Sequence, residues 1–282
     1  MSTTSEPPSS PRSPRVAIGV DIGGSGIKAG AVDLATGKLV GERFRMATPV
    51  PSTPEAVIDA TATLVARIER SAAVRAARGE GPLPIGVGIP SVVVDGVTRS
   101  AANIDQAWID YPAELELSRA LGRPTTLVND ADAAGVAEMR FGAGVGKKGV
   151  VLVLTLGTGL GSGMFVDGIL VPNTELGHME IRGRDAERRS AAVARVRRGL
   201  SWKAWAADLD EHLIAMDKLF SPGLFILGGG VSKNAARFVP HLTVRVPIAP
   251  AELRNDAGIV GAAMVAAERA AAADARDAAG PA

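Results

Sequence analysis

The stretch Asp21-Ile-Gly-Gly-Ser-Gly-Ile-Lys28 gives the strongest indication of the fold. It follows Val16–Val20, an apolar run with β-branched residues that is typical of a buried strand. Glycines at three of the four positions 23–26 let the backbone turn sharply and present its N–H groups to an anion. We predict that Asp21 holds Mg²⁺ directly or through water, and that phosphate is bound by Gly23, Gly24, Ser25, Gly26 and Lys28.

A dinucleotide-binding site is one alternative interpretation of this stretch. Gly24-x-Gly26-x-x-Ala29 fits the loose fingerprint of such sites, which requires a helix directly after the glycines. The sequence after Lys28 instead has glycines at positions 30 and 37, where a helix would be weakened, and its pattern predicts a strand, a tight turn and another strand. A hairpin whose glycines have only a structural role is the other alternative.

Composition limits the class of protein. The 282 residues are 46% hydrophobic, which is enough to bury a full core in two lobes. The net charge of +1 gives no overall attraction to nucleic acid or to a membrane, and the lack of cysteine excludes disulfides, thiolate zinc sites and thiol nucleophiles. No run approaches the roughly 18 apolar residues of a membrane span. We therefore expect a cytoplasmic protein with a disordered leader over residues 1–14.

A second acidic residue is expected at the end of a strand. Residues 124–130 predict a strand that ends on two polar residues, and residues 131–141 predict a helix that ends at Gly142. Asp130 at the end of this strand is a candidate catalytic acid, and the alternative is that Asn129 or Asp130 simply caps the helix. Earlier in the chain, Asn103 lies in an irregular polar stretch, and loops of this kind often carry binding groups.

The opening stretch is repeated about 135 residues later. The apolar run 149–154 leads into Thr155-Leu-Gly-Thr-Gly-Leu-Gly-Ser-Gly163, and a second strand then ends in a turn that contains Asp167. Two copies of one hairpin predict a duplicated fold with a cleft between its halves. Each hairpin could hold one end of a phosphate ester or anhydride.

In this order the motifs resemble those of the ROK family of sugar kinases, within the actin-like and hexokinase-like ATPase superfamily, and most closely those of its bacterial polyphosphate glucokinases. The matching segments are Asp21–Lys28, Asn103, Asn129-Asp130, Leu156–Gly163, Glu175–His178, Gly228–Ser232 and Asn255–Ala263. The resemblance runs from about Val16 to about Glu268 and implies a duplicated α/β fold of two lobes with an interlobe cleft. Residues 15–128 and about 257–275 would form the small lobe, residues 129–256 the large lobe and residues 276–282 a tail.

The resemblance also implies the chemistry. The expected reaction transfers the terminal phosphoryl group of polyphosphate to the 6-hydroxyl of glucose with Mg²⁺. Asp130 would be the general base, and an ionised carboxylate with an unshifted pKa would suffice for that role. The residues expected to bind the sugar are Asn103, Asn129, Asp130, Glu175, His178 and Glu187, the last preferred to Glu180. Further phosphate contacts are expected from Thr158, Gly159, Gly229 and Gly230.

The chain departs from the family in one region. Most ROK kinases carry zinc on three cysteines and on the counterpart of His178, so no zinc is expected here. Residues 182–203 instead contain eight basic residues. We predict that a polyphosphate chain follows Arg188, Arg195, Arg197, Arg198 and Lys203, and that the first, second and fourth of these share one helical face. A solvated charged helix is the alternative, whereas nucleic-acid binding is disfavoured because no aromatic residues alternate with the arginines.

Two other functions stay open. An ATP-dependent ROK hexokinase that acts on glucose, mannose or an N-acylhexosamine would use the same site. Sugar-responsive ROK repressors carry an N-terminal winged helix, and the few residues before Val16 lead us to expect none here. A catalytically silent sugar sensor would have no use for Asp130 as a base. The resemblance also suggests a homodimer.

Overall fold

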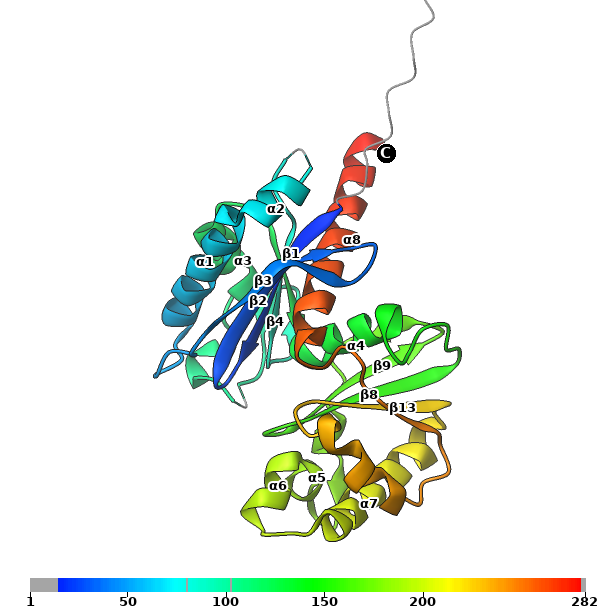
Figure 1. The fold of residues 1–282 in the computed structure, drawn as a ribbon. Coiled ribbons are helices and arrows are strands. Elements are labelled where there is room, and N and C mark those ends of the chain that lie inside the picture. Colours follow the sequence, from blue (N-terminus) through cyan, green and yellow to red (C-terminus); the bar gives the residue numbers. More distant parts are fainter. Residues whose placement is uncertain (1–14, 80, 102, 280–282) are drawn as a thin grey trace, which may run out of the picture.

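The computed structural model describes residues 15–79, 81–101 and 103–279, and it contains two five-stranded sheets with helices around them (Figure 1). The leader predicted over residues 1–14 lies outside the described residues. No helix in these ranges combines the length and the apolar character that crossing a membrane requires.

The two sheets have the same topology. The first has the order β3-β2-β1-β4-β7, with β1 (Val16–Gly23), β2 (Gly26–Asp33), β3 (Lys38–Met46), β4 (Ile85–Ile89) and β7 (Thr125–Asn129). The second has the order β10-β9-β8-β13-β14, with β8 (Val150–Leu156), β9 (Leu160–Val166), β10 (Ile169–Val171), β13 (Leu224–Gly228) and β14 (Ile248–Pro250). In each sheet an antiparallel hairpin is followed by two strands parallel to its first strand. The predicted duplication is therefore confirmed.

The opening stretch forms a hairpin, as the pattern predicted. β1 and β2 pair in antiparallel register from Val16 opposite Asp33 to Gly23 opposite Gly26, with only Gly24 and Ser25 between the strands. A strand therefore follows directly where the dinucleotide fingerprint requires a helix. This excludes the dinucleotide interpretation.

Helices cover both faces of the first sheet. Side chains alternate along β1, so that Ile18 and Val20 pack toward α1 (Pro54–Arg70) whereas Ala17 and Gly19 face α8 (Ala257–Ala279). The remaining helices here are α2 (Ala72–Ala77) and α3 (Ala113–Leu121), which lie with α1 on the side opposite to α8 (Figure 1).

Small residues allow α8 to approach the sheet closely. A Cβ added at Gly19 would overlap the carbonyl of Ile259, and one added at Gly86 in β4 would overlap the carbonyl of Ala262. The helix extends to Ala279 because the alanine-rich sequence favours helix throughout.

One helix connects the two halves. α4 (Asp130–Phe141) packs on α8, where a Cβ at Gly261 would overlap the carbonyl of Ala133. On its other side α4 packs on β9, where a Cβ at Gly161 would lie 2.8 Å from the Cβ of Ala131. The start of α4 is therefore held between α8, which covers the first sheet, and the second sheet.

The second half is built on α7 (Trp202–Phe220), whose N-cap is Ser201. Its stripe of Trp205, Leu209, Leu213 and Met216 is fully buried, whereas Trp202 and Phe220 are half-buried. The shorter elements are α5 (Glu187–Ser190), α6 (Ala192–Arg197), β5 (Val93–Val94), β6 (Val97–Thr98), β11 (Glu180–Ile181), β12 (Arg184–Asp185), and the 3-10 helices η1 (Gln106–Trp108), η2 (Leu176–His178), η3 (Ser232–Arg237), η4 (Val239–His241) and η5 (Arg254–Asp256).

Candidate functional site

The first hairpin places an acidic and a basic side chain opposite each other on its two strands. Asp21 and Lys28 are directly paired across β1 and β2, and the Lys28 Nζ donates to the Asp21 Oδ2 at 3.0 Å. Both side chains are partly exposed. Asp21 lies two residues before the end of its strand rather than at the tip, and its carboxylate already neutralises Lys28. The roles of these two residues toward metal and phosphate remain predictions.

Close approach explains the glycines of the hairpin turn. A Cβ at Gly24 would lie 2.8 Å from the backbone oxygen of Asn103, and one at Gly26 would lie 2.8 Å from the Arg45 Nη2. The turn is therefore packed against the loop that carries Asn103, an exposed residue of the predicted sugar site. This contact brings one sugar-site candidate beside the phosphate-binding candidates Gly23, Gly24 and Ser25.

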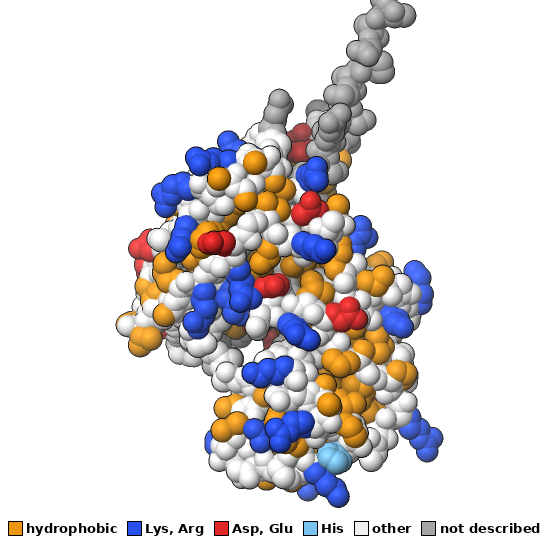
Figure 2. Space-filling model, in the orientation of Figure 1, with side chains coloured by type: hydrophobic (Ala, Val, Ile, Leu, Met, Phe, Trp, Pro, Cys, Tyr) orange, Lys and Arg blue, Asp and Glu red, His pale blue; other side chains and the backbone are white. Residues whose placement is uncertain are grey.

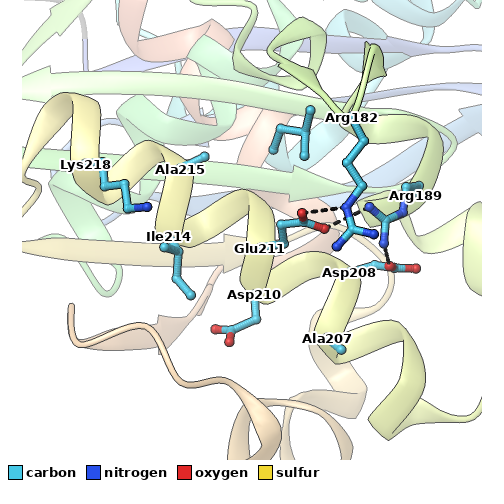
Figure 3. A pocket seen from close by; sticks show the side chains of 10 residues that line it. Arg182, Arg189, Ala207, Asp208, Asp210, Glu211, Ile214, Ala215 and Lys218 are labelled. Atoms are coloured by element: carbon cyan, nitrogen blue, oxygen red, sulfur yellow. Dashed lines mark hydrogen bonds and ion pairs between the residues drawn. The ribbon is translucent and has the colours of Figure 1, made fainter.

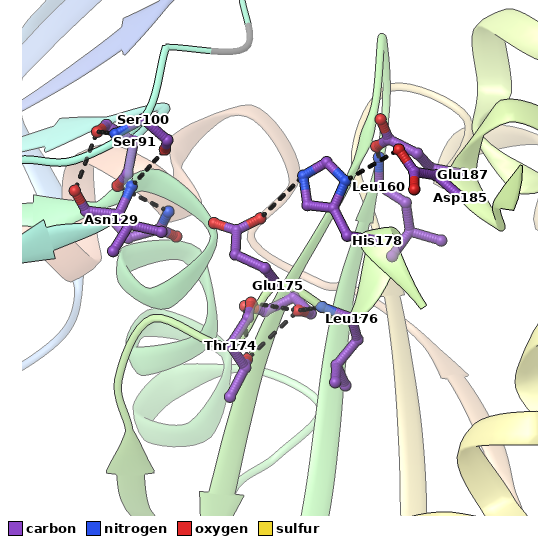
Figure 4. A network of polar contacts seen from close by, with 12 residues as sticks. Ser91, Ser100, Asn129, Leu160, Thr174, Glu175, Leu176, His178, Asp185 and Glu187 are labelled. Carbon is purple, nitrogen blue, oxygen red and sulfur yellow. Dashed lines mark hydrogen bonds and ion pairs between the residues drawn. The ribbon is translucent and has the colours of Figure 1, made fainter. Parts of the chain in front are cut away.

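Asn129 caps α4 with its side chain. Its Oδ1 accepts hydrogen bonds from the N–H groups of Ala131 at 2.8 Å and Asp132 at 3.0 Å, and its Nδ2 donates to the Ser91 carbonyl at 3.1 Å (Figure 4). The capping alternative is thus correct for Asn129, whose contact with sugar remains a prediction. Because Asn129 is the cap, the carboxylate of Asp130 is not used for that purpose.

Asp130 lies next to Asp21 across a glycine. Asp21 pairs with Gly88 of β4, and a Cβ at Gly88 would lie 3.6 Å from the Cα of Asp130. The pKa of Asp130 is raised to about 7. Burial is the main cause of this higher pKa and the charge of Asp21 the second, and the Ala131 N–H partly offsets the rise. The expectation of an unshifted pKa is therefore wrong, because it assumed an exposed carboxyl, whereas burial and then the nearby charge of Asp21 raise the pKa.

His178 lies between two carboxylates (Figure 4). Its Nε2 is 3.9 Å from the Glu175 Oε2, and its Nδ1 is 3.4 Å from the Asp185 Oδ2. Burial raises the pKa of the Glu175 carboxyl, with Glu187 adding to the effect and His178 opposing it. Asp185 thus explains the orientation of the His178 ring, although the sequence analysis did not include Asp185 among the site residues. Asp185 is brought there by pairing of β11 with β12.

Glu187 contacts the second hairpin. Its Oε2 accepts the Leu160 N–H at 2.9 Å, and a Cβ at Gly159 would lie 2.7 Å from the same oxygen. A Cβ at Gly177 would lie 3.2 Å from it, so the carboxylate is enclosed between the hairpin turn and the segment that carries Glu175. Glu180 is exposed on β11. This position is consistent with the preference for Glu187, which stays a prediction.

The other phosphate candidates lie along one edge of the second sheet. The β8–β9 turn contains Gly157, Thr158 and Gly159, and its Gly157 N–H donates to the Gly159 carbonyl at 2.9 Å. Gly229 follows β13 with a φ of +79°, and a Cβ there would overlap the carbonyl of Leu156 at the end of β8. The chain therefore turns here in the left-handed conformation that glycine tolerates. Gly230 follows in an exposed position.

The arginine run does not form one helix, so the expected helical face is wrong. Extended backbone at Ala191 separates α5 from α6. Arg195 lies over the ring of Trp202, with its Cζ 4.0 Å from the ring centroid, and Lys203 is exposed on α7. The residues that gather instead line a pocket of about 420 Å³, and they are Arg184, Arg188, Arg189, Arg197 and Arg198.

Acidic residues of α7 partly neutralise the arginines of this pocket. Figure 3 shows them in a second pocket, which is lined mainly by α7 and shares Arg189 with the first. Arg189 pairs with Asp208 and, at 2.8 Å, with Glu211, and Arg198 pairs with Asp208 at 2.6 Å. Arg182 pairs with the other carboxylate oxygen of Glu211 at 2.8 Å. Among the described residues no ion pair is found for Arg184, Arg188 or Arg197. These three guanidinium groups supply the net positive charge of the pocket.

A buried carboxylate that the sequence analysis missed lies on the same helix as Asp130. Asp132 is 1% exposed, and its Oδ2 accepts the Asn173 N–H at 2.7 Å. Burial raises its pKa to about 7. Asn173 in turn exchanges two side-chain hydrogen bonds with the backbone of Val93, at 2.8 and 2.9 Å, so this contact joins the two halves. The sequence did contain a signal for Asp132, because it is an acidic residue two positions after Asp130 in the first turn of a predicted helix.

The described residues contain no cluster of three His, Asp or Glu side chains that could hold a metal ion by themselves. Asp21 offers one carboxylate beside the phosphate candidates. One or two carboxylates with the remaining ligands from phosphate oxygens and water are what Mg²⁺ needs at phosphoryl-transfer sites, so the donor set fits this ion.

Known proteins resemble the chain over most of its length. A polyphosphate glucokinase of Mycobacterium tuberculosis is 45% identical over 262 residues, which cover 93% of this chain and 94% of that relative. The crystal structure of an inorganic polyphosphate/ATP-glucomannokinase from Arthrobacter sp. strain KM has a TM-score of 0.86 and 52% identity, covering 92% of this chain and 100% of that one. A ROK family glucokinase from Streptomyces griseus, solved with glucose and AMPPNP, has a TM-score of 0.75 and 28% identity, covering 90% and 99%.

The model of the ROK family matches residues 17–192, more than half of the chain. That range contains both hairpins, Asp130 and the segment from Glu175 to Glu187. The similar structures have the same two-domain fold as the two duplicated sheets described above. The chain belongs to the ROK family.

Proposed function

We propose that this protein is a glucokinase that transfers the terminal phosphoryl group of inorganic polyphosphate to the 6-hydroxyl of glucose. The observation that carries the proposal is Asp130, a partly buried carboxyl that is not used as a helix cap and that lies beside Asp21 and the first hairpin. With a pKa of about 7, its carboxyl can accept a proton near neutral pH.

The reaction balances as follows. The 6-oxygen of glucose forms a bond to the terminal phosphorus, the bond from that phosphorus to the chain breaks, and the polyphosphate leaves one unit shorter. Asp130 takes the proton of the hydroxyl. Asn103, Glu175, His178 and Glu187 would hold the other hydroxyls, for which carboxylate, amide and imidazole groups supply both donors and acceptors. Positioning and charge stabilisation account for most of the catalysis in such transfers.

Mg²⁺ fits this site. When bound, it would neutralise charge on the phosphate oxygens, and Asp21 would hold it directly or through water. The backbone N–H groups of the two hairpin turns and the Thr158 hydroxyl would bind the phosphates at the two ends of the bond that breaks.

The arginine-lined pocket supports polyphosphate as the donor. Arg184 lies three residues before Glu187 and Arg188 directly after it, and Glu187 contacts the second hairpin, which supports a path from the pocket to the phosphate candidates. Figure 2 shows Lys and Arg side chains on both sides of the indentation between the two halves. A long anion could extend from the hairpins into this pocket, where planar guanidinium groups match phosphate oxygens.

A second donor and a second sugar are also proposed. The Arthrobacter relative is named a polyphosphate/ATP-glucomannokinase, which favours some use of ATP and of mannose by this chain. Location in the cytoplasm and a homodimeric state remain predictions from the family resemblance. A sugar sensor without catalytic activity is the alternative that the position of Asp130 disfavours.

The test is an assay of the purified protein with glucose and Mg²⁺, in which polyphosphate is compared with ATP. Turnover with polyphosphate supports the proposal, and turnover with ATP alone would refute the role given to the arginine pocket. We expect Asp130→Ala to lose turnover while it keeps part of its glucose binding. Near-native turnover in this variant would rule out Asp130 as the base.

A further inference from the structure

His212 is a buried residue on α7 whose two ring nitrogens both have partners. Its side chain is 1% exposed, its Nδ1 lies 2.9 Å from the Ser190 Oγ, and its Nε2 lies 3.0 Å from the Leu176 carbonyl oxygen. Burial lowers the pKa of His212, so the neutral ring is the form present at neutral pH.

The partners determine which nitrogen carries the proton. A carbonyl oxygen only accepts, so the Nε2 of His212 must donate to Leu176. The Nδ1 of the neutral ring then accepts from the hydroxyl of Ser190. The Ser190 Oγ also lies 3.0 Å from the Ala186 carbonyl oxygen, but that oxygen already accepts the Ser190 N–H at 3.1 Å, so the single hydroxyl hydrogen is free for His212. Ser190 is fully buried as well, so the chain Ser190–His212–Leu176 is enclosed and both ring nitrogens are satisfied.

Both ends of this chain belong to segments that carry predicted sugar ligands. Leu176 opens η2, directly after Glu175 and two residues before His178. Ser190 ends α5, the four-residue helix that Glu187 begins. His212 comes from neither segment but from α7, the long core helix of the second half. It therefore links the two segments through a rigid element.

We propose that His212 and Ser190 are positioning residues that fix the segments of Glu175, His178 and Glu187 for sugar binding. This inference rests on the proposed function, because it assumes that these three side chains bind glucose. A closed and fully satisfied polar network in a buried site restricts the groups it joins, and binding groups must be held to within a fraction of an ångström to act together. Removing the link weakens sugar binding and leaves phosphoryl transfer from a saturated site nearly intact.

Two substitutions of one residue separate the ends of the link. The terminal nitrogen of glutamine reaches about as far as the Nε2 of histidine, so His212→Gln can still donate to Leu176. The shorter side chain of asparagine in His212→Asn places its amide near the position of the Nδ1, so it can contact Ser190 but not Leu176. We expect His212→Asn to raise the KM and Kd for glucose about tenfold, the loss of about one hydrogen bond, with kcat within about threefold. His212→Gln, which keeps the Leu176 contact and loses only the Ser190 contact, should show a smaller loss of about threefold, and Ser190→Ala should show the same smaller loss.

Glucose binding is measured by calorimetry without a phosphoryl donor, and kcat and KM are measured with polyphosphate. The control is His241→Asn, a change at an exposed histidine of η4 that should alter neither quantity. Ser190→Ala, which removes a single hydroxyl, replaces His212→Asn if that variant does not fold. Wild-type glucose affinity in a folded His212→Asn or Ser190→Ala variant overturns the inference, and so does an equal loss in the Gln and Asn variants.

Hydrogen exchange separates this inference from the proposed function. Amides of residues 175–179 should exchange faster in His212→Asn than in the wild type, and amides of α1 should not change. A wild-type protein that does not bind glucose overturns the proposed function, and with it the assignment to sugar. Unchanged exchange over residues 175–179 overturns the link itself, whatever the protein binds.

Discussion

The raised pKa of Asp130 predicts a pH dependence that an ordinary aspartate would not give. With a pKa of about 7, the carboxylate is the form of roughly a tenth of the free enzyme at pH 6 and of roughly nine tenths at pH 8. If Asp130 is the base, kcat/KM for glucose should therefore rise about tenfold over this range, because this ratio reports ionisation of the free enzyme. An aspartate near its usual pKa of about 3.9 would be ionised throughout, and the profile would be flat.

The assay measures initial rates at low glucose and saturating polyphosphate from pH 5.5 to 8.5, at constant ionic strength. The structure also predicts how the midpoint moves. Burial is the larger cause of the raised pKa and the charge of Asp21 the second, so Asp21→Asn should lower the midpoint without restoring the ordinary value of an aspartate. A flat profile, or a midpoint in Asp21→Asn that is equal to or above that of the wild type, would refute the assignment.

Three further predictions concern the donor pocket, the packing of α8 and a buried acid. Replacing both Arg184 and Arg188 by alanine should raise the KM for polyphosphate about tenfold while the reaction with ATP, measured in parallel, changes little. Gly86→Ala should lower the free energy of unfolding by about 3 kcal/mol, because its Cβ would overlap the backbone of α8, whereas Gly79→Ala, with no neighbour within 4 Å, should have almost no effect on the urea midpoint. Because the pKa of Asp132 is raised, the folded state keeps a proton that the unfolded state loses between about pH 4 and pH 7. The free energy of unfolding of the wild type therefore falls as the pH rises through that range. Asp132→Asn should lack this part of the decline, and urea midpoints with parallel pH dependence in the two proteins would contradict it.

The parts of the site that lie within one local pattern could be predicted from the sequence. The hairpin at Asp21 and its repeat at Thr155 have short apolar strands and glycine turns, whose signals extend over fewer than about ten residues. The acid at Asp130 could be located for the same reason, since the end of a buried strand and the start of a helix are both local features.

The parts that depend on distant segments could not be predicted. The pKa of Asp130 depends on its burial and on the charge of Asp21, which lies across Gly88 from it, and these three residues come from three different strands or helices. The arginine run was interpreted as one helix because charge spacing alone cannot show the break at Ala191. There the Val193 N–H donates to the Gly157 carbonyl of the second hairpin at 3.1 Å, a contact between segments about 36 residues apart.

His212 shows that some of this information was present but not used. In α7 it lies three residues after Leu209 and four before Met216, and therefore on the same buried stripe. A polar side chain on such a stripe must find partners, and here they are Leu176 and Ser190 from the two segments of the predicted sugar site. Asp130, the predicted base, is thus held by contacts of α4 with both halves, whereas the predicted sugar ligands Glu175, His178 and Glu187 depend mainly on side chains of the second half such as His212 and Ser190. Substitutions in that second half should therefore change sugar affinity more readily than they change the position of the base.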